Sequence, residues 1–222
     1  MTGGNLPVLY SFRRCPYAMR GRMALLNSGQ TCRLREVLLR DKPAQMLAAS
    51  PKGTVPVVVM PDGTIIDESL DVMLWALDQS DADGWLTPAR GSLDDMLALI
   101  EENDGPFKTH LDRYKYDTRY PGENSMDHRA AGLVFLEKLN ALLAADGYLF
   151  GSRPALADVA IFPFVRQFAN TDRTWFDVLP LPHLQQWLAD WLESDLFKGI
   201  MQKWPVWQDG DEEPLFPPQE AA

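Results

Sequence analysis

Residues 10–18 read Tyr-Ser-Phe-Arg-Arg-Cys-Pro-Tyr-Ala, and this stretch joins two different hydrophobic patterns. Before it, Leu6 to Phe12 is apolar and typical of a strand. After it, Pro16 to Ser28 carries apolar residues at helical spacing, and Gly29 follows as a helix stop. The stretch therefore predicts a strand that leads directly into a helix at Cys15.

Strand-like and helical runs continue to alternate up to residue 80. They cover residues 32–39, 41–49, 55–60, 64–66 and 70–77. The last two strand-like runs are joined by Pro61-Asp62-Gly63, a turn signal that predicts a hairpin. The order β-α-β-α-β-β-α predicts an α/β layer with a mixed sheet.

After residue 80 the sequence changes character. Polar residues and breakers at 80–91 predict a linker, and beyond it we find helical spacing and no convincing strand of period two. The clearest helical runs cover residues 127–145, 161–169 and 187–192. We therefore predict two domains, residues 1–80 and residues 91–222, the second all-helical. Its proline-rich acidic end, residues 205–222, is expected to be an extended strap or a loose tail.

The composition excludes several classes of function. The net charge of −10 argues against a general nucleic-acid binder, which needs a basic surface. No run approaches the roughly 20 apolar residues that span a bilayer, and no signal-peptide pattern is visible. Two cysteines are too few for a disulfide framework. The three histidines have no metal-ligand spacing, so we expect no metal and a soluble, cytoplasmic protein.

Cys15 is the strongest candidate for chemistry. Proline suits the first helical position, so Pro16 places Cys15 at the N-cap, where unpaired N–H groups and the helix dipole favour thiolate over thiol. Ala18 stands where a Cys-x-x-Cys motif has its second cysteine, so the chemistry expected here is monothiol. The alternative for Cys15 is a buried structural cysteine that happens to precede proline. Cys32, inside a predicted strand, is expected to be inert core.

Two further signals each allow a plainer interpretation. Val55-Pro56 opens a strand, and a cis bond there would leave the Val55 backbone free to pair with a peptide ligand; an ordinary edge-strand proline is the alternative. Ser69 follows Asp67 and Glu68 at a predicted helix start, which suits the carboxylate and ammonium of an α-amino acid. Ordinary helix capping explains the same three residues.

Taken together and in this order, the three signals resemble the glutathione S-transferase superfamily. The stretches that carry the resemblance are residues 10–18, Lys52-Gly53-Thr54-Val55-Pro56-Val57 and Asp67-Glu68-Ser69. The resemblance is nearest to cysteine-type members such as the omega class. It implies a thioredoxin-like N-terminal domain, an all-helical C-terminal domain, glutathione as co-substrate and a homodimer.

The resemblance also implies roles for individual residues. Cys15 matches the catalytic cysteine, and Val55 matches the residue whose backbone pairs with glutathione before the cis-proline, Pro56. Glu68 and Ser69 match the pair that holds the γ-glutamyl end. Lys42 matches, less closely than the others, an omega-class lysine near the glycyl carboxylate.

Further positions follow from the same resemblance. In this fold the substrate pocket lies between the domains, which makes five aromatic residues candidates for its wall: Phe12, Tyr17, Tyr114, Tyr116 and Phe168. Asp158 resembles the acidic residue of the family's buried folding motif. Ala155 stands three residues earlier, where the family has a Ser or Thr helix cap, and a lost cap costs about 1 kcal/mol.

Three functions are compatible with these residues. The first is thiol transfer of the thioltransferase or dehydroascorbate-reductase type, in which Cys15 removes glutathione from a mixed disulfide. The second is conjugation of glutathione to an electrophile. The third is a regulatory protein of the same fold without turnover, similar to the stringent starvation proteins; such a protein would need neither Cys15 nor Glu68 and Ser69. The small-molecule partner is accordingly a thiol, a disulfide or an electrophile, with no nucleic acid and no membrane.

Overall fold

The computed structural model describes residues 6–218, which form two compact units. Unit 1 joins the chain up to Asp83 with the segment from Ser194 onward, and unit 2 is Gly84–Glu193. The predicted domains differ at the C-terminal end, because they place all residues from 91 onward in the helical domain. The segment after Ser194 belongs instead with the N-terminal part of the chain.

Unit 1 is built on a mixed sheet with the strand order β4-β3-β1-β2-β5. The strands are β1 (Val8–Ser11), β2 (Cys32–Glu36), β3 (Val57–Val59), β4 (Ile65–Ile66) and β5 (Leu215–Phe216). Central β1 is parallel to β2 and antiparallel to β3, so that Val8 is paired with Arg33 on one side and Val59 on the other. This register brings the carboxyl ends of β1 and β2 and the start of β3 to one edge of the sheet.

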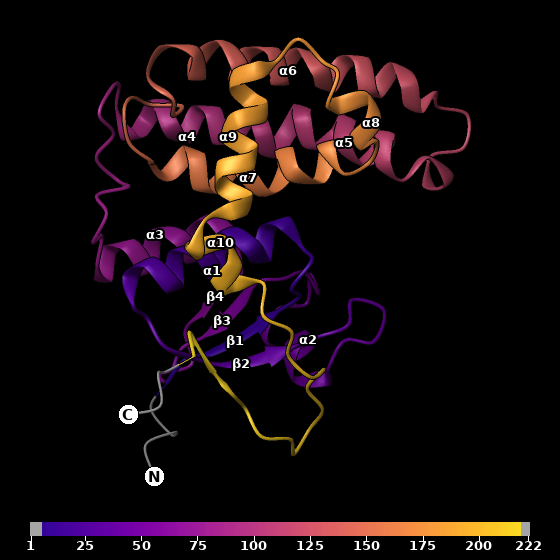
Figure 1. Cartoon of the computed structure of the whole chain (residues 1–222). Helices are drawn as coiled ribbons and strands as arrows, with labels where there is room; N and C mark the ends of the chain where they lie inside the picture. Colours follow the sequence, from indigo (N-terminus) through magenta and orange to yellow (C-terminus); the bar gives the residue numbers. More distant parts are fainter. Residues whose placement is uncertain (1–5, 219–222) are drawn as a thin grey trace. The chain divides into compact units, whose positions relative to one another are not determined.

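Within the described part of unit 1, the sheet is completed by the helices α1 (Pro16–Ser28), α2 (Ala44–Ala49), α3 (Ser69–Gln79) and α10 (Asp195–Ile200). Helix α1 has the predicted bounds, and it packs against α3 and against α10 (Figure 1). Gly21 faces Pro56 across this layer, where an added Cβ would lie 3.3 Å from the proline Cγ. The absence of a side chain on Gly21 therefore lets α1 approach the loop before β3 closely.

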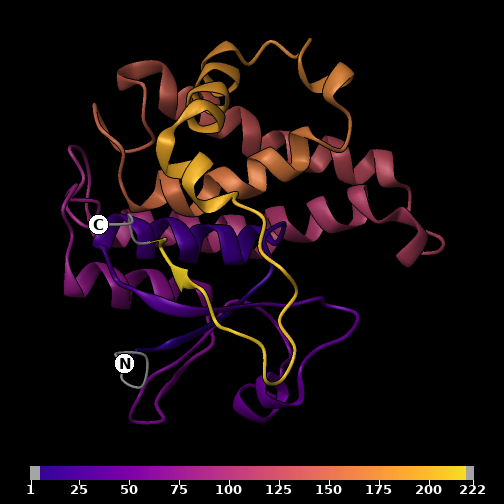
Figure 2. The ribbon, with the colours of Figure 1, turned by 60° about the horizontal axis from the view of Figure 1, so that its bottom comes forward.

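The C-terminal segment from Lys203 to Phe216, which we call the strap, runs beside β2 in an extended form (Figure 2). Its backbone is hydrogen-bonded to β2 at both ends: Trp207 N donates to Glu36 O at 2.8 Å, and Leu34 N donates to Pro214 O at 2.7 Å. Strand β5 extends the sheet here, with Phe216 opposite Cys32. A strand of two residues is too short to show an alternating hydrophobic pattern in the sequence. The expectation of no strand after residue 91 was therefore wrong at this point.

Unit 2 is helical throughout its regular structure. Its helices are α4 (Leu93–Glu102), η2 (Asn103–Phe107), α5 (Lys108–Lys115), η3 (Asp117–Arg119), α6 (Ser125–Asp146), α7 (Leu156–Ala169), α8 (Arg173–Phe176) and α9 (Pro182–Glu193). The π-helical turn η2 joins α4 to α5 and contains Pro106, which has no N–H to donate to the preceding turn. Pro163 lies two turns inside α7, because that helix begins five residues earlier than the predicted start at 161.

Asp158 is the buried polar centre of unit 2. Its carboxylate accepts three hydrogen bonds of 3.0 Å, from Leu149 N, Ala155 N and Trp187 Nε1. Burial raises the pKa of Asp158 to about 6, although these three donors oppose the shift. Ala155 is the N-cap of α7, so the reciprocal bond, in which a Ser or Thr hydroxyl oxygen would accept from a backbone N–H of the first turn, is missing.

The predicted fold class is confirmed: a thioredoxin-like unit is followed by a helical one. Within residues 6–218, no helix is both long enough and apolar enough to cross a membrane.

Candidate functional site

Cys15 lies where the sequence predicts it, at the N-cap of α1. Its backbone is extended (φ −77°, ψ 125°), Pro16 occupies the first helical position, and Met19 N donates to Cys15 O at 2.9 Å. The Cys15 side chain is partly exposed. In this conformation its sulfur faces the Val55 carbonyl oxygen at 3.8 Å and does not cap the helix.

A buried ion pair holds the loop before Cys15. Glu36, at the end of β2, accepts from Arg13 N at 2.6 Å through Oε1, and its Oε2 is paired with Arg22 of α1. Arg22 also donates to Ile200 O at 3.2 Å, which attaches α10 to the same network. Burial lowers the pKa of Arg22, and the Glu36 carboxylate opposes the shift. These contacts fix the Phe12–Cys15 loop from the side of β2.

The Val55–Pro56 bond is cis, as one of the two predicted alternatives requires. Val55 is buried and packs in the same apolar cluster as Phe12, Cys15 and Trp207. The pairing of β3 with β1 begins only at Val57, opposite Tyr10. Val55 therefore precedes the ladder, with its carbonyl turned toward the cysteine sulfur.

A small cavity of about 110 Å³ lies between Val55 and the amino end of α3. Its lining comes from α1, from the loop before β3 and from the start of α3: Tyr17, Thr54, Val55, Asp67, Glu68 and Ser69. Ser69 is 4% exposed, and its Oγ accepts a hydrogen bond of 3.0 Å from Arg20 Nε. Because Arg20 uses one lone pair of the oxygen, the hydroxyl proton is left to donate to an acceptor in the cavity.

The two carboxylates that line this cavity, Asp67 and Glu68, both have partners: Lys52 is paired with both, and the Ser50 hydroxyl donates to Asp67. Lys52 Nζ lies 2.5 Å from Glu68 Oε1 and 3.2 Å from Asp67 Oδ1. The Ser50 hydroxyl donates to Asp67 at 2.7 Å, and this bond, with the help of Lys52, lowers the pKa of Asp67. Both carboxylates are thus held at the mouth of the cavity, where a ligand ammonium would have to share them with Lys52.

Lys42 reaches the same region from the segment before α2. A Cβ built on Gly53 would lie 3.1 Å from Lys42 Nζ, so the ammonium lies directly over this glycine. Gly53 has φ +62°, a backbone conformation that favours glycine. Lys42 therefore lies next to the loop that carries Thr54 and Val55.

The other cysteine is far from this chemistry. Cys32 is fully buried at the start of β2, and burial raises its pKa to about 12. At about 3.3 Å per residue, β2 separates Cys32 from the Cys15 end of the sheet by about 13 Å, and a disulfide needs Cα atoms within about 7 Å. Neither cysteine is in a disulfide, and Ala18 is buried where a second redox cysteine would stand.

The five predicted pocket aromatics do not form one group. Phe12 and Tyr17 flank Cys15 in unit 1 and are partly exposed. Phe168 is 1% exposed and packs against the rings of Phe107, Tyr114 and Trp175, and Tyr114 itself is 8% exposed. Both therefore lie in the aromatic core of unit 2, whereas Tyr116 is half-buried and its hydroxyl accepts from Gln167.

Sequence reasoning missed Arg20 as a member of the site. Its one signal is a charged residue on the apolar side of α1, five positions after Cys15, and the structure leaves it 2% exposed. The fold brings Arg20 to Ser69, 49 residues further along the chain. No group of three potential metal ligands gathers within residues 6–218.

Two family models match the chain. The glutathione S-transferase N-terminal domain matches residues 9–84, and the glutathione S-transferase C-terminal domain matches residues 127–190. Together they cover more than half of the sequence, in the order that the superfamily has.

Solved structures with the same fold include several transferases. A glutathione transferase family member from Pseudomonas fluorescens, which holds two bound glutathione molecules, is 16% identical with a TM-score of 0.77 over 90% of this chain and 94% of its own. The transferase URE2P6 from Phanerochaete chrysosporium, in complex with oxidized glutathione, is 17% identical with a TM-score of 0.76, covering 90% and 96%. Glutathione transferase Omega 1C from Trametes versicolor is 18% identical with a TM-score of 0.74, covering 89% and 92%.

Proposed function

Because this chain belongs to the glutathione S-transferase superfamily, we propose that it is a glutathione-dependent thiol transferase that acts through a mixed disulfide at Cys15. The observation that carries the proposal is a partly exposed cysteine at a helix N-terminus, beside a cis-proline loop and a small polar cavity. A helix N-terminus favours a thiolate, which is the reactive form of cysteine. The hydroxyl of a tyrosine or serine cannot carry out this chemistry, because it cannot form a disulfide bond to the substrate sulfur for a second thiol to exchange.

Glutathione is the proposed co-substrate, and each of its ends has a proposed partner. The Val55 backbone would pair with the cysteinyl part, and the Ser69 hydroxyl would donate to the γ-glutamyl carboxylate. Glu68 would accept from the ammonium, in competition with Lys52. Lys42 would face the glycyl carboxylate across the Gly53 turn.

The reaction proceeds in two exchange steps. The Cys15 thiolate attacks the glutathione sulfur of a mixed disulfide RS–SG, so the Cys15–glutathione bond forms and RS⁻ leaves, taking up a proton. The thiolate of a second glutathione then attacks the glutathione sulfur on Cys15, which releases oxidised glutathione and restores the Cys15 thiolate. In sum RS–SG and GSH give RSH and GSSG, and the electrons come from glutathione.

The sulfur of Cys15 must change its surroundings during this cycle. As a thiol it donates toward the Val55 carbonyl. Deprotonation removes that donor and places a negative sulfur beside a carbonyl oxygen, so we expect the thiolate to turn toward the N–H groups of the first turn of α1. The loop held by Glu36 and Arg22 keeps the backbone fixed while the side chain turns.

Resolution by an internal thiol is not part of the proposal. Ala18 cannot form a disulfide, and Cys32 is buried at the opposite end of β2 with a pKa raised to about 12. An external glutathione must therefore complete the cycle, which makes the enzyme a monothiol type. We further propose that it works in the cytoplasm as a homodimer, which sedimentation velocity would test by the mass of the purified protein.

The decisive experiment measures glutathione-dependent reduction of bis(2-hydroxyethyl) disulfide, coupled to glutathione reductase and NADPH. The wild type is compared with Cys15→Ala, with Cys32→Ala as the matched control that also removes one thiol. We expect Cys15→Ala to lose the activity and Cys32→Ala to keep it. Mass spectrometry of the wild type treated with oxidised glutathione should show one glutathionyl group, on the peptide that contains Cys15.

The same three proteins distinguish the competing functions. Conjugation of glutathione to 1-chloro-2,4-dinitrobenzene that persists in Cys15→Ala, without disulfide reduction in the wild type, would replace the proposal by conjugation. Glutathione binding without either activity in the wild type would instead indicate a regulatory protein.

A further inference from the structure

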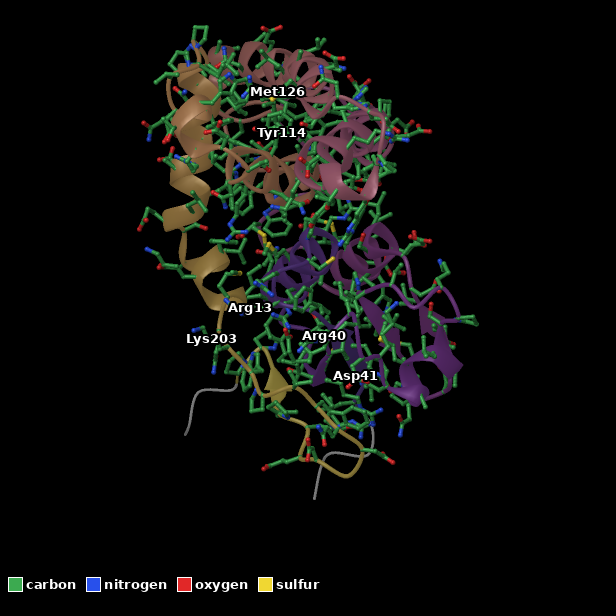
Figure 3. All side chains as sticks on the ribbon, turned by 90° about the vertical axis from the view of Figure 1, so that its right-hand side faces the viewer. Arg13, Arg40, Asp41, Tyr114, Met126 and Lys203 are labelled. Carbon is green, nitrogen blue, oxygen red and sulfur yellow. The ribbon has the colours of Figure 1, made fainter. Side chains whose placement is uncertain are left out.

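Two histidines of unit 2 meet where α5 packs against α6. His110 of α5 and His128 of α6 are 18 positions apart in the sequence, and their Nδ1 atoms are 2.9 Å apart. Figure 3 marks this part of the unit by Tyr114, one turn after His110, and by Met126, two residues before His128. The ring centroids are 5.2 Å apart, farther than the nitrogens, so the rings face each other with their Nδ1 edges. Sequence spacing does not reveal this pair, because only tertiary packing brings the two helices together.

Glu123, in the segment before α6, fixes the protonation of this pair. Its Oε2 lies 2.7 Å from His128 Nε2 and 2.7 Å from Arg113 Nε. A carboxylate can only accept hydrogen bonds, so His128 Nε2 carries a proton and the Nδ1 of the neutral ring carries a lone pair. In the contact between the two rings, His110 Nδ1 is therefore the donor and His128 Nδ1 the acceptor.

The charge and exposure of the pair suit a ligand that binds neutral imidazole. Burial lowers the pKa of His110, and the nearby His128 and Arg113 lower it further, which keeps more of this ring neutral at pH 7. His110 is half-buried, and 19% of the His128 side chain is exposed. Metal ions bind histidine in its neutral form.

The separation of the two nitrogens matches two ligands of one metal ion. Ligands about 2.0–2.1 Å from a metal are about 2.9 Å apart at an angle of 90°, and about 3.3 Å apart in a tetrahedral site. The observed 2.9 Å therefore fits neighbouring positions of a square-planar or octahedral ion, as in sites of Cu²⁺ and Ni²⁺. Both rings must tilt for their lone pairs to converge on the ion, and their partial exposure leaves room for this. Histidines that bind metals commonly donate their other N–H to a carboxylate, as His128 does to Glu123.

We propose that His110 and His128 form a two-imidazole site for a divalent late transition-metal ion, with Cu²⁺ and Ni²⁺ as the best fit. The ion binds both Nδ1 atoms, and water fills its other positions. The proton on His110 moves from Nδ1 to Nε2 through water, so the neutral pair releases no net proton. Glu123 does not touch the ion and holds His128 in the tautomer that binds it. The site joins α5 to α6 within unit 2 and is independent of the proposed glutathione chemistry at Cys15.

Copper titration of the tag-free full chain, followed by electron paramagnetic resonance, tests the site. Every protein in the series carries Cys15→Ala, because the partly exposed thiol would also bind copper. We expect a single bound Cu²⁺ whose spectrum shows coupling to two nitrogen ligands. Ni²⁺ should bind more weakly than Cu²⁺, and Ca²⁺, which takes oxygen ligands, should not bind.

Substitutions within the titration series assign the ligands. His110→Gln and His128→Gln, on different helices, should each abolish the two-nitrogen spectrum. The control His183→Gln removes the exposed histidine at the start of α9 and should keep it. Glu123→Ala should weaken copper binding by about tenfold to a hundredfold, because it removes the carboxylate that orients His128.

Four results would overturn the proposal. They are no copper binding by the Cys15→Ala parent, a two-nitrogen spectrum that persists in either His110→Gln or His128→Gln, an equal loss in His183→Gln, and an unchanged affinity in Glu123→Ala. Circular dichroism of each variant verifies that it is folded, so that a lost spectrum reports the missing ligand.

Discussion

Replacing Ser69 by alanine removes one hydroxyl from the amino end of α3 and tests the proposed binding of the γ-glutamyl carboxylate. The Ser69 oxygen lies 3.0 Å from Arg20 Nε, and both side chains are almost fully buried. A hydroxyl has one proton and two lone pairs. Because Arg20 takes one lone pair, the proton can donate to an acceptor in the cavity that Glu68 also lines.

The size of the effect follows from these contacts. A hydrogen bond to a charged group contributes about 1.5–3 kcal/mol, and each 1.4 kcal/mol is about tenfold in affinity. Ser69→Ala should therefore weaken glutathione binding by about tenfold to a hundredfold. It also removes the buried acceptor of Arg20, so the free energy of unfolding should fall by about 1–3 kcal/mol.

Two further variants separate binding from folding. Ser69→Thr keeps the oxygen and should bind glutathione within a few-fold of the wild type. Ser80→Ala makes the same chemical change at the exposed carboxyl end of the same helix and should alter neither quantity. Calorimetry with glutathione gives the affinity, and urea unfolding gives the stability. A folded Ser69→Ala protein whose affinity is within about twofold of the wild type would refute the assignment of this hydroxyl.

Three other predictions concern stability. The buried Asp158 binds its proton more tightly in the folded state, with a pKa of about 6 against 3.8. Through this group, lowering the pH from about 7 to about 4 should therefore raise the free energy of unfolding by up to about 3 kcal/mol. Asp158→Asn should remove this increment in urea titrations at the two pH values, and equal increments in both proteins would contradict it. Ala155→Ser should supply the missing N-cap of α7 and raise the free energy of unfolding by about 1 kcal/mol. The control Ala155→Val adds no hydrogen-bond acceptor and should not raise it. Equal effects of the two changes would argue against capping. The Glu213 carboxylate is paired with Arg33 and Arg35, so Glu213→Gln should loosen the strap. Limited proteolysis should then cut the strap sooner than in the wild type. An unchanged cutting rate would show that the backbone bonds to β2 are enough to hold the strap.

The strap also indicates where local and tertiary information separate in this protein. Its residues carry no strand pattern, because two paired residues are too short to show a period. They form a strand because they pair with the edge of β2. The unpaired backbone N–H and C=O groups of an edge strand can form hydrogen bonds with an extended segment that lies beside it. Arg13, Arg14 and Lys203 line one cavity for the same reason, because the strap returns to the carboxyl end of β2.

Local sequence determined the elements and the place of the cysteine proposed to react. The α1 bounds, the N-cap position of Cys15 and the alternation of strands and helices up to residue 80 depend on neighbouring residues, whose hydrophobic period and proline placement act over a few positions. Tertiary structure alone decided that Arg20 orients Ser69, that Glu36 and Arg22 hold the cysteine loop, and that Phe168 lies in a core. These depend on burial and on contacts between residues distant in the chain, and a period of two or 3.6 residues contains no information about either.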